Sequence, residues 1–334
     1  MLKLWPCESR IYSYRTKIDN MQLKTPKDLA IKARMMGKKT ISYSQFNMYK
    51  QCPHHWKLAY MDGHKVFEPS IFLTFGTAMH EVLQEYLQTM YSITAKAADE
   101  LPLEANLKEK MSTLYKESVK DNEGKHYSDK DQLTEFYYDG CDIIDFFKKK
   151  RGIYFSKKNC ELVGIEMPLL IETDENDKIM MMGFQDIVIK ESYQNGIEKL
   201  KIYDIKTSTF GWREGQKKDN GDQLRIYKKY FSKQYNVPEE NIEIEYFIVK
   251  RKLYENCDFP QRRIQIYQPP SGKPSMNKTS RSLAEFIKTA FTIDGKHNKD
   301  RAYPAVAGKN NKNCKWCEFK GDYDLCPKKG RLKE

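Results

Sequence analysis

The sequence predicts an α/β protein in which a mixed central β-sheet is flanked by helices. Three successive runs have the composition of strands: ELVGIEMPLLIET at 161–173, KIMMMGFQDIVIKES at 178–192 and EKLKIYDIKTS at 198–208. A helical run at 222–235 separates them from a further strand run at 242–253. Because a helix between two strands makes a crossover connection, we expect a parallel strand pair beside the antiparallel ones.

The three central runs are joined by turn residues, which predicts successive antiparallel pairing. Asn-Asp occupies the first joint at 176–177, and Asn-Gly occupies the second at 195–196. A last strand is expected at 262–268. The stretch QPPSGKPSMNKTS at 268–280 is expected to be a plain loop.

Helices are expected ahead of this sheet. Ser42 or Ser44 is suited to cap a first short helix. Residues 71–92 carry apolar side chains at steps of three or four, which is the stripe of an amphipathic helix. The charged stretch 93–158 continues in a helical pattern and predicts a helical lobe.

The patterns predict one main domain preceded by an arm. Residues 1–40 are basic and polar with little periodicity, and they predict a loosely packed N-terminal arm. Residues 41–334 form the main domain. Within it, the sheet core is expected to cover 159–270, and a cysteine-rich region covers 300–334.

Composition favours a soluble globular protein that binds a polyanion. The chain has 334 residues, of which 40% are hydrophobic, enough to bury a large core. No stretch approaches about 18 apolar residues and no signal peptide is found, so we expect a cytoplasmic protein, in the host cytoplasm if viral, with no membrane partner. Lysine and arginine outnumber acids by 58 to 46, which favours nucleic acid as partner. The eight cysteines favour reduced thiols that bind metal where they cluster.

Two acidic residues on neighbouring predicted strands indicate a metal site. In YDIKTS, Asp204 and Lys206 lie two residues apart and project from the same face of the strand. Alone, such a pair is more simply a surface ion pair worth about 0–1 kcal/mol. Asp186, however, interrupts an apolar run on the preceding strand, where an unpaired carboxylate is costly. Asp186 and Asp204 are therefore suited to share one Mg²⁺ or Mn²⁺ ion.

Two predicted helices add further candidates. His80 lies four residues after Gly76, and the missing side chain of Gly76 lets another backbone approach the imidazole. Gln223 and Tyr227 are also four residues apart and share one helix face. Taken singly, His80 is consistent with an ordinary core or surface histidine, and Gln223 with Tyr227 is consistent with an ordinary amphipathic helix.

Together and in this order, these segments resemble the PD-(D/E)XK nuclease superfamily, and in particular its RecB-like exonuclease branch. The resemblance covers about 42–327 and is carried by FGTAMHE, GFQD, DIK and QLRIY within the frame opened by SYSQFNMYKQCPHHWKL. It implies a restriction-endonuclease-like core with a mixed central sheet. In that family a divalent metal stabilises charge on the phosphate and makes water nucleophilic near neutral pH.

The resemblance also implies roles for individual residues. The metal is held by a histidine and two aspartates, here His80, Asp186 and Asp204. Lys206 orients or activates the attacking water, either as a cation or, if its pKa is lowered, by proton transfer. The contacts to substrate phosphates fall on Gln223 and Tyr227. Two nearby acids, Glu81 and Glu166, are compatible with alternative ligands or with outer partners of the ligands, but they are more simply assigned to solvated faces and are left outside the site.

Three cysteines near the C-terminus make an incomplete metal site. CKWCEFKGDYDLC places Cys314, Cys317 and Cys326 within thirteen residues, whereas tetrahedral zinc and iron-sulfur sites usually take four protein ligands. Cys52, in YKQCPHHWKLAY, is the candidate fourth ligand. A subset of RecB-like nucleases, including AddB-type recombination nucleases and CRISPR adaptation nucleases, is similar in this placement, which implies a [4Fe-4S] cluster.

The identity of this metal stays open between two main alternatives. Structural Zn²⁺ is the main rival to the cluster, with His54 or His55 able to replace a cysteine. Unligated thiols are a third alternative. Either metal would form a C-terminal clasp, fastening the tail beside the first helix and coupling metal binding to folding.

These observations lead us to expect a Mg²⁺- or Mn²⁺-dependent deoxyribonuclease that degrades single-stranded DNA or DNA ends in recombination, repair or replication. One alternative is a nuclease subunit whose specificity is set by a partner of the helicase or CRISPR adaptation type. Another is a catalytically idle DNA-binding scaffold. A basic RNA-binding protein with a zinc clasp would leave the acidic pair unexplained. No Walker-type phosphate loop is present, so a helicase would be a separate chain.

Overall fold

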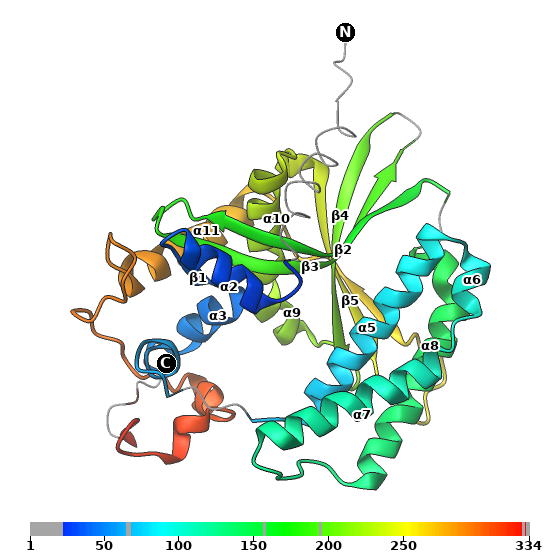
Figure 1. Ribbon diagram of the computed structural model, residues 1–334, viewed down its shortest axis with the longest axis horizontal. Coiled ribbons are helices and arrows are strands. Elements are labelled where there is room, and N and C mark those ends of the chain that lie inside the picture. The colour runs from blue at the N-terminus through cyan, green and yellow to red at the C-terminus, as the bar shows by residue number, and fades with distance from the viewer. Residues whose placement is uncertain (1–22, 65–67, 156–157, 194–195, 329–330, 332–334) are drawn as a thin grey trace.

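A six-stranded mixed sheet lies at the centre of the described part of the chain (Figure 1). The computed structural model describes residues 23–64, 68–155, 158–193, 196–328 and 331. The strands are β1 (Lys39–Ile41), β2 (Cys160–Glu172), β3 (Ile179–Ser192), β4 (Glu198–Ser208), β5 (Ile242–Lys250) and β6 (Ile264–Tyr267). The predicted α/β class is confirmed.

Three of the strands form the predicted antiparallel meander. β3 pairs with β2 along most of its length. It pairs with β4 over a shorter stretch, from Ile187 opposite Tyr203 to Ser192 opposite Glu198. The chain then crosses through helix α10 (Asp222–Tyr235) and enters β5, which runs parallel to β4. The predicted mixture of antiparallel and parallel pairs is therefore confirmed.

One edge of β3 has an opening between two neighbouring strands. Because β2 covers one edge of β3, β1 and β4 share the other. β1 pairs with residues 179–181 of β3, and β4 pairs with residues 187–192. Among the described residues, no strand pairs with 182–186 on that edge. This opening positions the candidate site described below.

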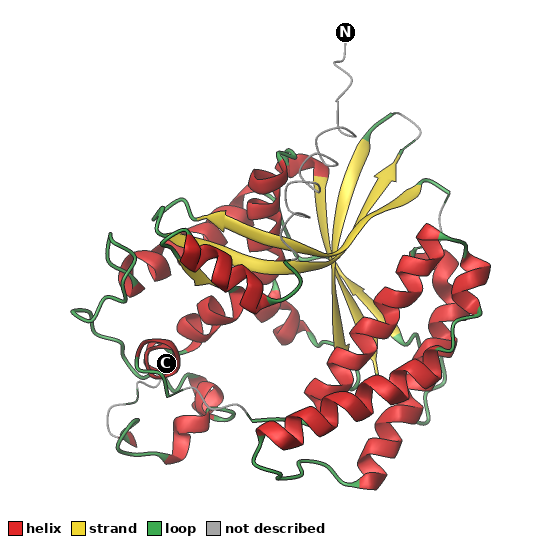
Figure 2. Ribbon diagram, viewed as in Figure 1, coloured by secondary structure: helices red, strands yellow, loops and turns green. Residues whose placement is uncertain are grey.

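Helices cover both faces of the sheet (Figure 2). One face packs against α3 (Tyr43–Gln51), α4 (Pro53–Trp56), α10 and α11 (Lys273–Ala290). The other packs against α5 (Ile71–Ser92), α6 (Ala95–Asp99), α7 (Leu103–Asp121) and α8 (Lys130–Tyr154). Side chains of β4 alternate between the two cores, with Ile202 in the first and Tyr203 in the second. Helices α6 to α8 confirm the helical character predicted for 93–158.

Short helices complete the described chain. They are α2 (Pro26–Met35), η1 (Lys57–Met61), α9 (Glu214–Asn220), η2 (Glu239–Asn241), η3 (Lys309–Cys314) and η4 (Glu318–Gly321). Of all the helices that the structure describes, none has both the length and the apolar character that crossing a bilayer requires.

The loosely packed arm predicted over 1–40 is wrong for its second part. Residues 1–22 lie outside the described residues. From Pro26 to Met35 the chain forms α2, in which Leu29 and Ala33 are fully buried, and β1 then joins the sheet. The sequence pattern does not reveal these elements, because α2 is short and β1 has only three residues. Elements this short are stabilised mainly by packing against the rest of the fold.

The plain loop predicted over 268–280 is also wrong. Helix α11 begins at Lys273, directly after Gly272. Pro274 is compatible with this start, because the first helical turn does not use its N–H groups in intrahelical hydrogen bonds. Proline and glycine often signal a loop, but here they mark the beginning of a helix.

An aromatic cluster fastens the N-terminal helices to the C-terminal part of the chain. Trp56 of α4 is fully buried, and its ring centroid lies 5.5 Å from that of Phe286 on α11. It also lies 5.9 Å from Phe291 and 5.7 Å from Tyr303. Burial of these rings joins segments more than 200 residues apart in sequence, so the fold depends on this contact.

We therefore predict that Trp56→Ala lowers the free energy of unfolding by about 3–5 kcal/mol, because it removes a buried aromatic side chain and leaves a cavity. Urea unfolding followed by circular dichroism measures the change. Trp316→Ala is the control, because that side chain is 85% exposed and its removal should cost less than about 0.5 kcal/mol. Equal destabilisation by the two substitutions would contradict the structural role of Trp56.

Candidate active site and cysteine cluster

The candidate active site lies at the opening beside β3. The last pair joining β3 to β4 is Ile187 with Tyr203, and Asp186 and Asp204 come directly after it. Oδ2 of Asp186 accepts a hydrogen bond of 2.7 Å from the backbone N–H of Ile205. This side-chain bond links the two strands just beyond their last backbone pair. Both aspartates therefore lie at the point where β3 and β4 separate.

Asp204 is enclosed between a lysine and a glutamine. The residue is 2% exposed. Its Oδ2 lies 2.6 Å from Nζ of Lys206, and its Oδ1 accepts a 2.8 Å hydrogen bond from Nε2 of Gln223 on α10. Asp204 and Lys206 thus share one face of β4, as the strand pattern predicts. The partners of Asp204 compensate for the burial of its charge.

His80 reaches this group from α5. Its Nε2 lies 2.8 Å from Oδ2 of Asp186. The helix comes close to β4 at Gly76, where a Cβ atom would lie 3.1 Å from Oγ1 of Thr207. Glycine therefore permits the approach, although the neighbour is a threonine side chain rather than the backbone that the sequence suggested.

Glu166 belongs to the same group: its side chain is 40% exposed, but it also contacts His80 and Gln84, which favours the alternative-ligand assignment over a solvated face. Its Oε1 lies 3.6 Å from Nδ1 of His80 and accepts a 2.6 Å hydrogen bond from Nε2 of Gln84. Gln84 is buried and also donates to the backbone oxygen of Asp186 at 3.1 Å. Gln84 therefore ties Glu166 to the strand that carries Asp186. The Glu81 side chain is about equally exposed, but it pairs with Lys110 and makes no contact with His80 or Asp186 among the described ion pairs.

The backbone of Glu166 is unusual for its residue type. Its φ is +49°, in the left-handed region that costs about 1–3 kcal/mol for a residue other than glycine. Two sequence signals could have identified it. Glu166 comes opposite Asp186 in the register of the β2–β3 hairpin, and Gln84 follows His80 by four residues on one helix face.

Tyr227 packs inside the protein beside the site. It is 8% exposed, and a Cβ atom added to Gly183 on β3 would lie 2.9 Å from its hydroxyl oxygen. Gly183 is therefore needed for close packing. In this structure Tyr227 is buried, and the amide nitrogen of Gln223 donates one hydrogen bond to Asp204.

Burial and mutual charge shift the ionisation of these groups. Burial lowers the pKa of His80, but the hydrogen bond and charge of Asp186, with further charge from Glu166, raise it more. Burial raises the pKa of Glu166 and that of Asp204, the latter well above its usual value although Lys206 opposes the shift. Burial lowers the pKa of Lys206, but Asp204 and Asp186 raise it more, so Lys206 stays an ammonium.

The donors at the opening fit a hard divalent cation. His80, Glu166 and Asp186 each offer one ligand atom, and these atoms lie within 4.8 Å of one another. Asp204 lies beyond the same last β3–β4 pair as Asp186, but its two oxygens are occupied by Lys206 and Gln223. One imidazole with several carboxylate oxygens suits Mg²⁺ or Mn²⁺.

The four predicted cysteine ligands meet at one small pocket. Its lining includes Cys52, Cys314, Cys317 and Cys326. Residues 305–328 and 331, here called the C-terminal clasp, are joined to the region of Cys52 by direct bonds. Asn313 donates to the backbone oxygen of Gln51 at 2.7 Å, and the backbone N–H of Val306 donates to Sγ of Cys52 at 3.3 Å.

The histidines beside Cys52 differ in their freedom to bind metal. Nε2 of His54 lies 2.8 Å from the backbone oxygen of Leu325, a contact in which the ring donates. His55 lies 2.9 Å from a carboxylate oxygen of Glu318 and, with Cys317, forms a second group of donors within 4.8 Å of one another. The described part of the chain thus offers four thiols for an iron-sulfur cluster and keeps a zinc site with His55 open.

The mixed sheet and the group of oxygen and nitrogen donors at its break point to the class of metal-dependent hydrolases. Residues 40–326 match the family described as the PD-(D/E)XK nuclease superfamily, and the chain belongs to this superfamily. Its members are nucleases that use divalent metals.

The similarity of the chain to solved structures is weak. A solved structure described as "Crystal structure of SSO0001" is similar at 15% identity, covering 83% of this chain and 93% of that chain. Its TM-score of 0.30 is too low to carry an argument. No curated protein matches the chain.

The contacts of Glu166 predict that Glu166→Ala weakens Mn²⁺ binding by about 10–100-fold, the range for losing a partner of a ligating histidine. Isothermal titration calorimetry measures the affinity. Glu81→Ala is the matched control, because Glu81 lies next to His80 in sequence but pairs with Lys110. Unchanged Mn²⁺ affinity in Glu166→Ala would show that Glu166 takes no part in the site.

Proposed function

We propose that this chain is a Mg²⁺- or Mn²⁺-dependent DNA exonuclease of the RecB-like branch, acting on single strands or DNA ends in recombination, repair or replication. The observation that carries the proposal is the convergence of His80, Asp186, Asp204 and Lys206 on one opening in the sheet. The branch and the exonucleolytic mode are supported by the order of the four motifs along the sequence.

His80 and Asp186 would hold the metal, with Asp204 as the second aspartate and Glu166 as an added carboxylate. A bound divalent metal supplies charge stabilisation on the phosphate and lowers the pKa of a bound water. Gln223 holds one oxygen of Asp204 at 2.8 Å and so orients that carboxylate. Ligand atoms that are oriented before the metal binds reduce the ordering that binding requires.

Lys206 acts in this proposal as a fixed positive charge. Its ammonium lies 2.6 Å from Asp204 and is paired with a buried carboxylate, which favours the protonated form. A cation at this position is suited to stabilise negative charge that develops on the scissile phosphate. Of the two roles that the resemblance allowed, the geometry supports the cation rather than the proton acceptor.

The set of side chains argues against an idle scaffold. A protein that only bound DNA would gain nothing from enclosing Asp204 beside Asp186, because buried carboxylates repel each other and the DNA backbone alike. A nuclease needs these negative charges to attract the metal. The retained carboxylates therefore favour catalysis.

Asp204→Asn tests this proposal. It should lower the rate of DNA degradation by at least about 100-fold. Removing an outer partner of a metal ligand already lowers activity by up to about 100-fold, and Asp204 is proposed as a ligand itself. End-labelled single- and double-stranded DNA with Mg²⁺ or Mn²⁺ provides the assay, and circular single strands should resist if the enzyme needs ends.

Asp177→Asn is the matched control for this substitution, because it makes the same chemical change at an exposed turn. Circular dichroism verifies folding of both variants. Equal degradation by wild type and Asp204→Asn would disprove the active-site assignment, and rapid cutting of circular strands would disprove the exonuclease assignment.

We also propose that Cys52, Cys314, Cys317 and Cys326 hold a [4Fe-4S] cluster. Their shared pocket and the four thiol donors support this, and His54 is already engaged by the backbone oxygen of Leu325. The role would be structural, because the cluster would join the C-terminal clasp to the N-terminal helices.

Protein purified without oxygen should contain iron and acid-labile sulfide in equal amounts and absorb visible light. Cys52→Ser should lose both, because it removes one of four ligands. Cys141→Ser, at a half-buried cysteine on α8, is the control and should retain them. Stoichiometric zinc without sulfide would disprove the cluster and establish the zinc alternative.

A further inference from the structure

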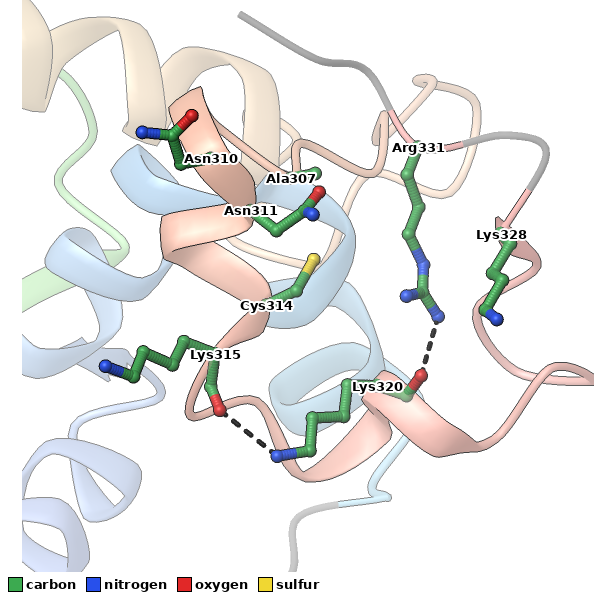
Figure 3. Close-up of a pocket in the computed structure, with 8 residues that line it drawn as sticks. All are labelled: Ala307, Asn310, Asn311, Cys314, Lys315, Lys320, Lys328 and Arg331. Atoms are coloured by element: carbon green, nitrogen blue, oxygen red, sulfur yellow. Dashed lines mark hydrogen bonds between the residues drawn. The ribbon is translucent and has the colours of Figure 1, made fainter.

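A basic pocket of about 550 Å³ opens on the C-terminal clasp (Figure 3). Its lining consists of four cations and four uncharged residues: Lys315, Lys320, Lys328, Arg331, Ala307, Asn310, Asn311 and Cys314. None of these described lining residues is acidic. The pocket lies beside the cysteine cluster, since Cys314 lines both.

The positive charge of this pocket is not neutralised from within. Among the described residues, no carboxylate lies within 4.0 Å of the side-chain nitrogens of the four lining cations. Residues 309–331 contain seven basic and three acidic residues. Of these acids, Glu318 pairs with His55, and Asp322 accepts a hydrogen bond from the backbone of Leu325. The pocket is therefore suited to a polyanion.

Two exposed aromatic rings adjoin the pocket cations. Trp316 is 85% exposed and Tyr323 is 52% exposed. Nζ of Lys315 lies 5.2 Å from the centroid of the Trp316 ring, and Nζ of Lys328 lies 5.0 Å from that of Tyr323. Aromatic rings next to cations are the arrangement on which unpaired bases stack while their phosphates are neutralised.

Hydrogen bonds within the clasp hold the walls of the pocket in place. Arg331 donates to the backbone oxygens of Lys320 and Cys326, at 2.9 and 2.6 Å. Lys320 donates to the backbone oxygen of Lys315 at 3.1 Å, as Figure 3 shows. Lys328 donates no hydrogen bond from its side chain within the described residues. Walls that are held before binding reduce the ordering that binding an anion requires, and Lys328 stays available to contact it.

We propose that this pocket binds the backbone of a single nucleic-acid strand, with Lys315 and Lys328 at phosphates and Trp316 and Tyr323 stacked on bases. The proposal deepens and rests on the proposed function, since a nuclease supplies the reason for a polyanionic strand. The rings favour a single strand over a duplex, because the bases of a duplex are already stacked inside it. The pocket is a holding site separate from the residues of the opening.

Binding is measured by fluorescence anisotropy with a labelled oligothymidylate, in full-length Asp204→Asn protein so that the strand is not cut. Lys315→Ala/Lys328→Ala should weaken binding by about ten-fold and lower the slope of log affinity against log salt by about 1.4, corresponding to two lost phosphate contacts. Lys288→Ala/Lys299→Ala is the matched control: it removes two other exposed lysines that have no described carboxylate partner. It should change affinity by less than about two-fold.

Stacking has a separate readout. Oligothymidylate should quench tryptophan fluorescence, and Trp316→Phe should lose most of this quenching, because Trp316 is far more exposed than the buried Trp56. Equal affinity of the two double-lysine variants would overturn the proposal, as would binding of duplex as tightly as single strands.

The outcomes separate this proposal from the nuclease assignment. If wild type cuts DNA while the pocket variant binds like the control, the pocket proposal fails and the nuclease assignment stands. If wild type cuts no DNA but binding depends on Lys315 and Lys328, the nuclease assignment fails and the pocket proposal stands.

Discussion

The divergence of β4 from β3 is the constraint on which the site depends. The two strands pair only as far as Ile187 and Tyr203, and β1 takes up the same edge of β3 further along. In a continuous sheet, the next two residues would be sealed between neighbouring strands. Here Asp186 and Asp204 instead face an opening that helix α5 and helix α10 reach from different sides, bringing His80 and Gln223.

This arrangement offsets the cost of placing several carboxylates together. An isolated buried carboxylate is strongly disfavoured, but each one here has a compensating donor. Asp186 accepts from the backbone of Ile205 and contacts His80, Asp204 contacts Lys206, and Glu166 accepts from Gln84. Burial, with added repulsion from Asp186, still raises the pKa of Asp204 and that of Glu166. A divalent cation would relieve this repulsion, so the same repulsion that costs stability gives the site its affinity for metal.

Local patterns in the sequence predicted the strands and the residues that follow from strand alternation. Asp186, Asp204 and Lys206 could be placed because period-two alternation and turn residues are local signals. Glu166 was harder to place, because strand alternation does not reveal its left-handed backbone or its bond to Gln84, which is 82 residues away in sequence. The start of α11 is hidden for a different reason. Gly-Lys-Pro at 272–274 is compatible with both a loop and a helix start, and the burial of one face of α11 against the sheet decides between them.

The apolar core of the C-terminal clasp is too small to hold this segment in place by itself. Its buried cluster contains Leu58, Phe319 and Cys326, with three partly buried neighbours. Ordering each residue costs about 1–2 kcal/mol of backbone entropy, which so few apolar contacts cannot offset over the whole segment. Hydrogen bonds from Asn313 and to Cys52 help, yet each contributes only about 0.5–1.5 kcal/mol. A metal bound by four thiolates would supply the missing free energy, and because Cys314 lines the basic pocket as well, it would also hold one wall of that pocket in place.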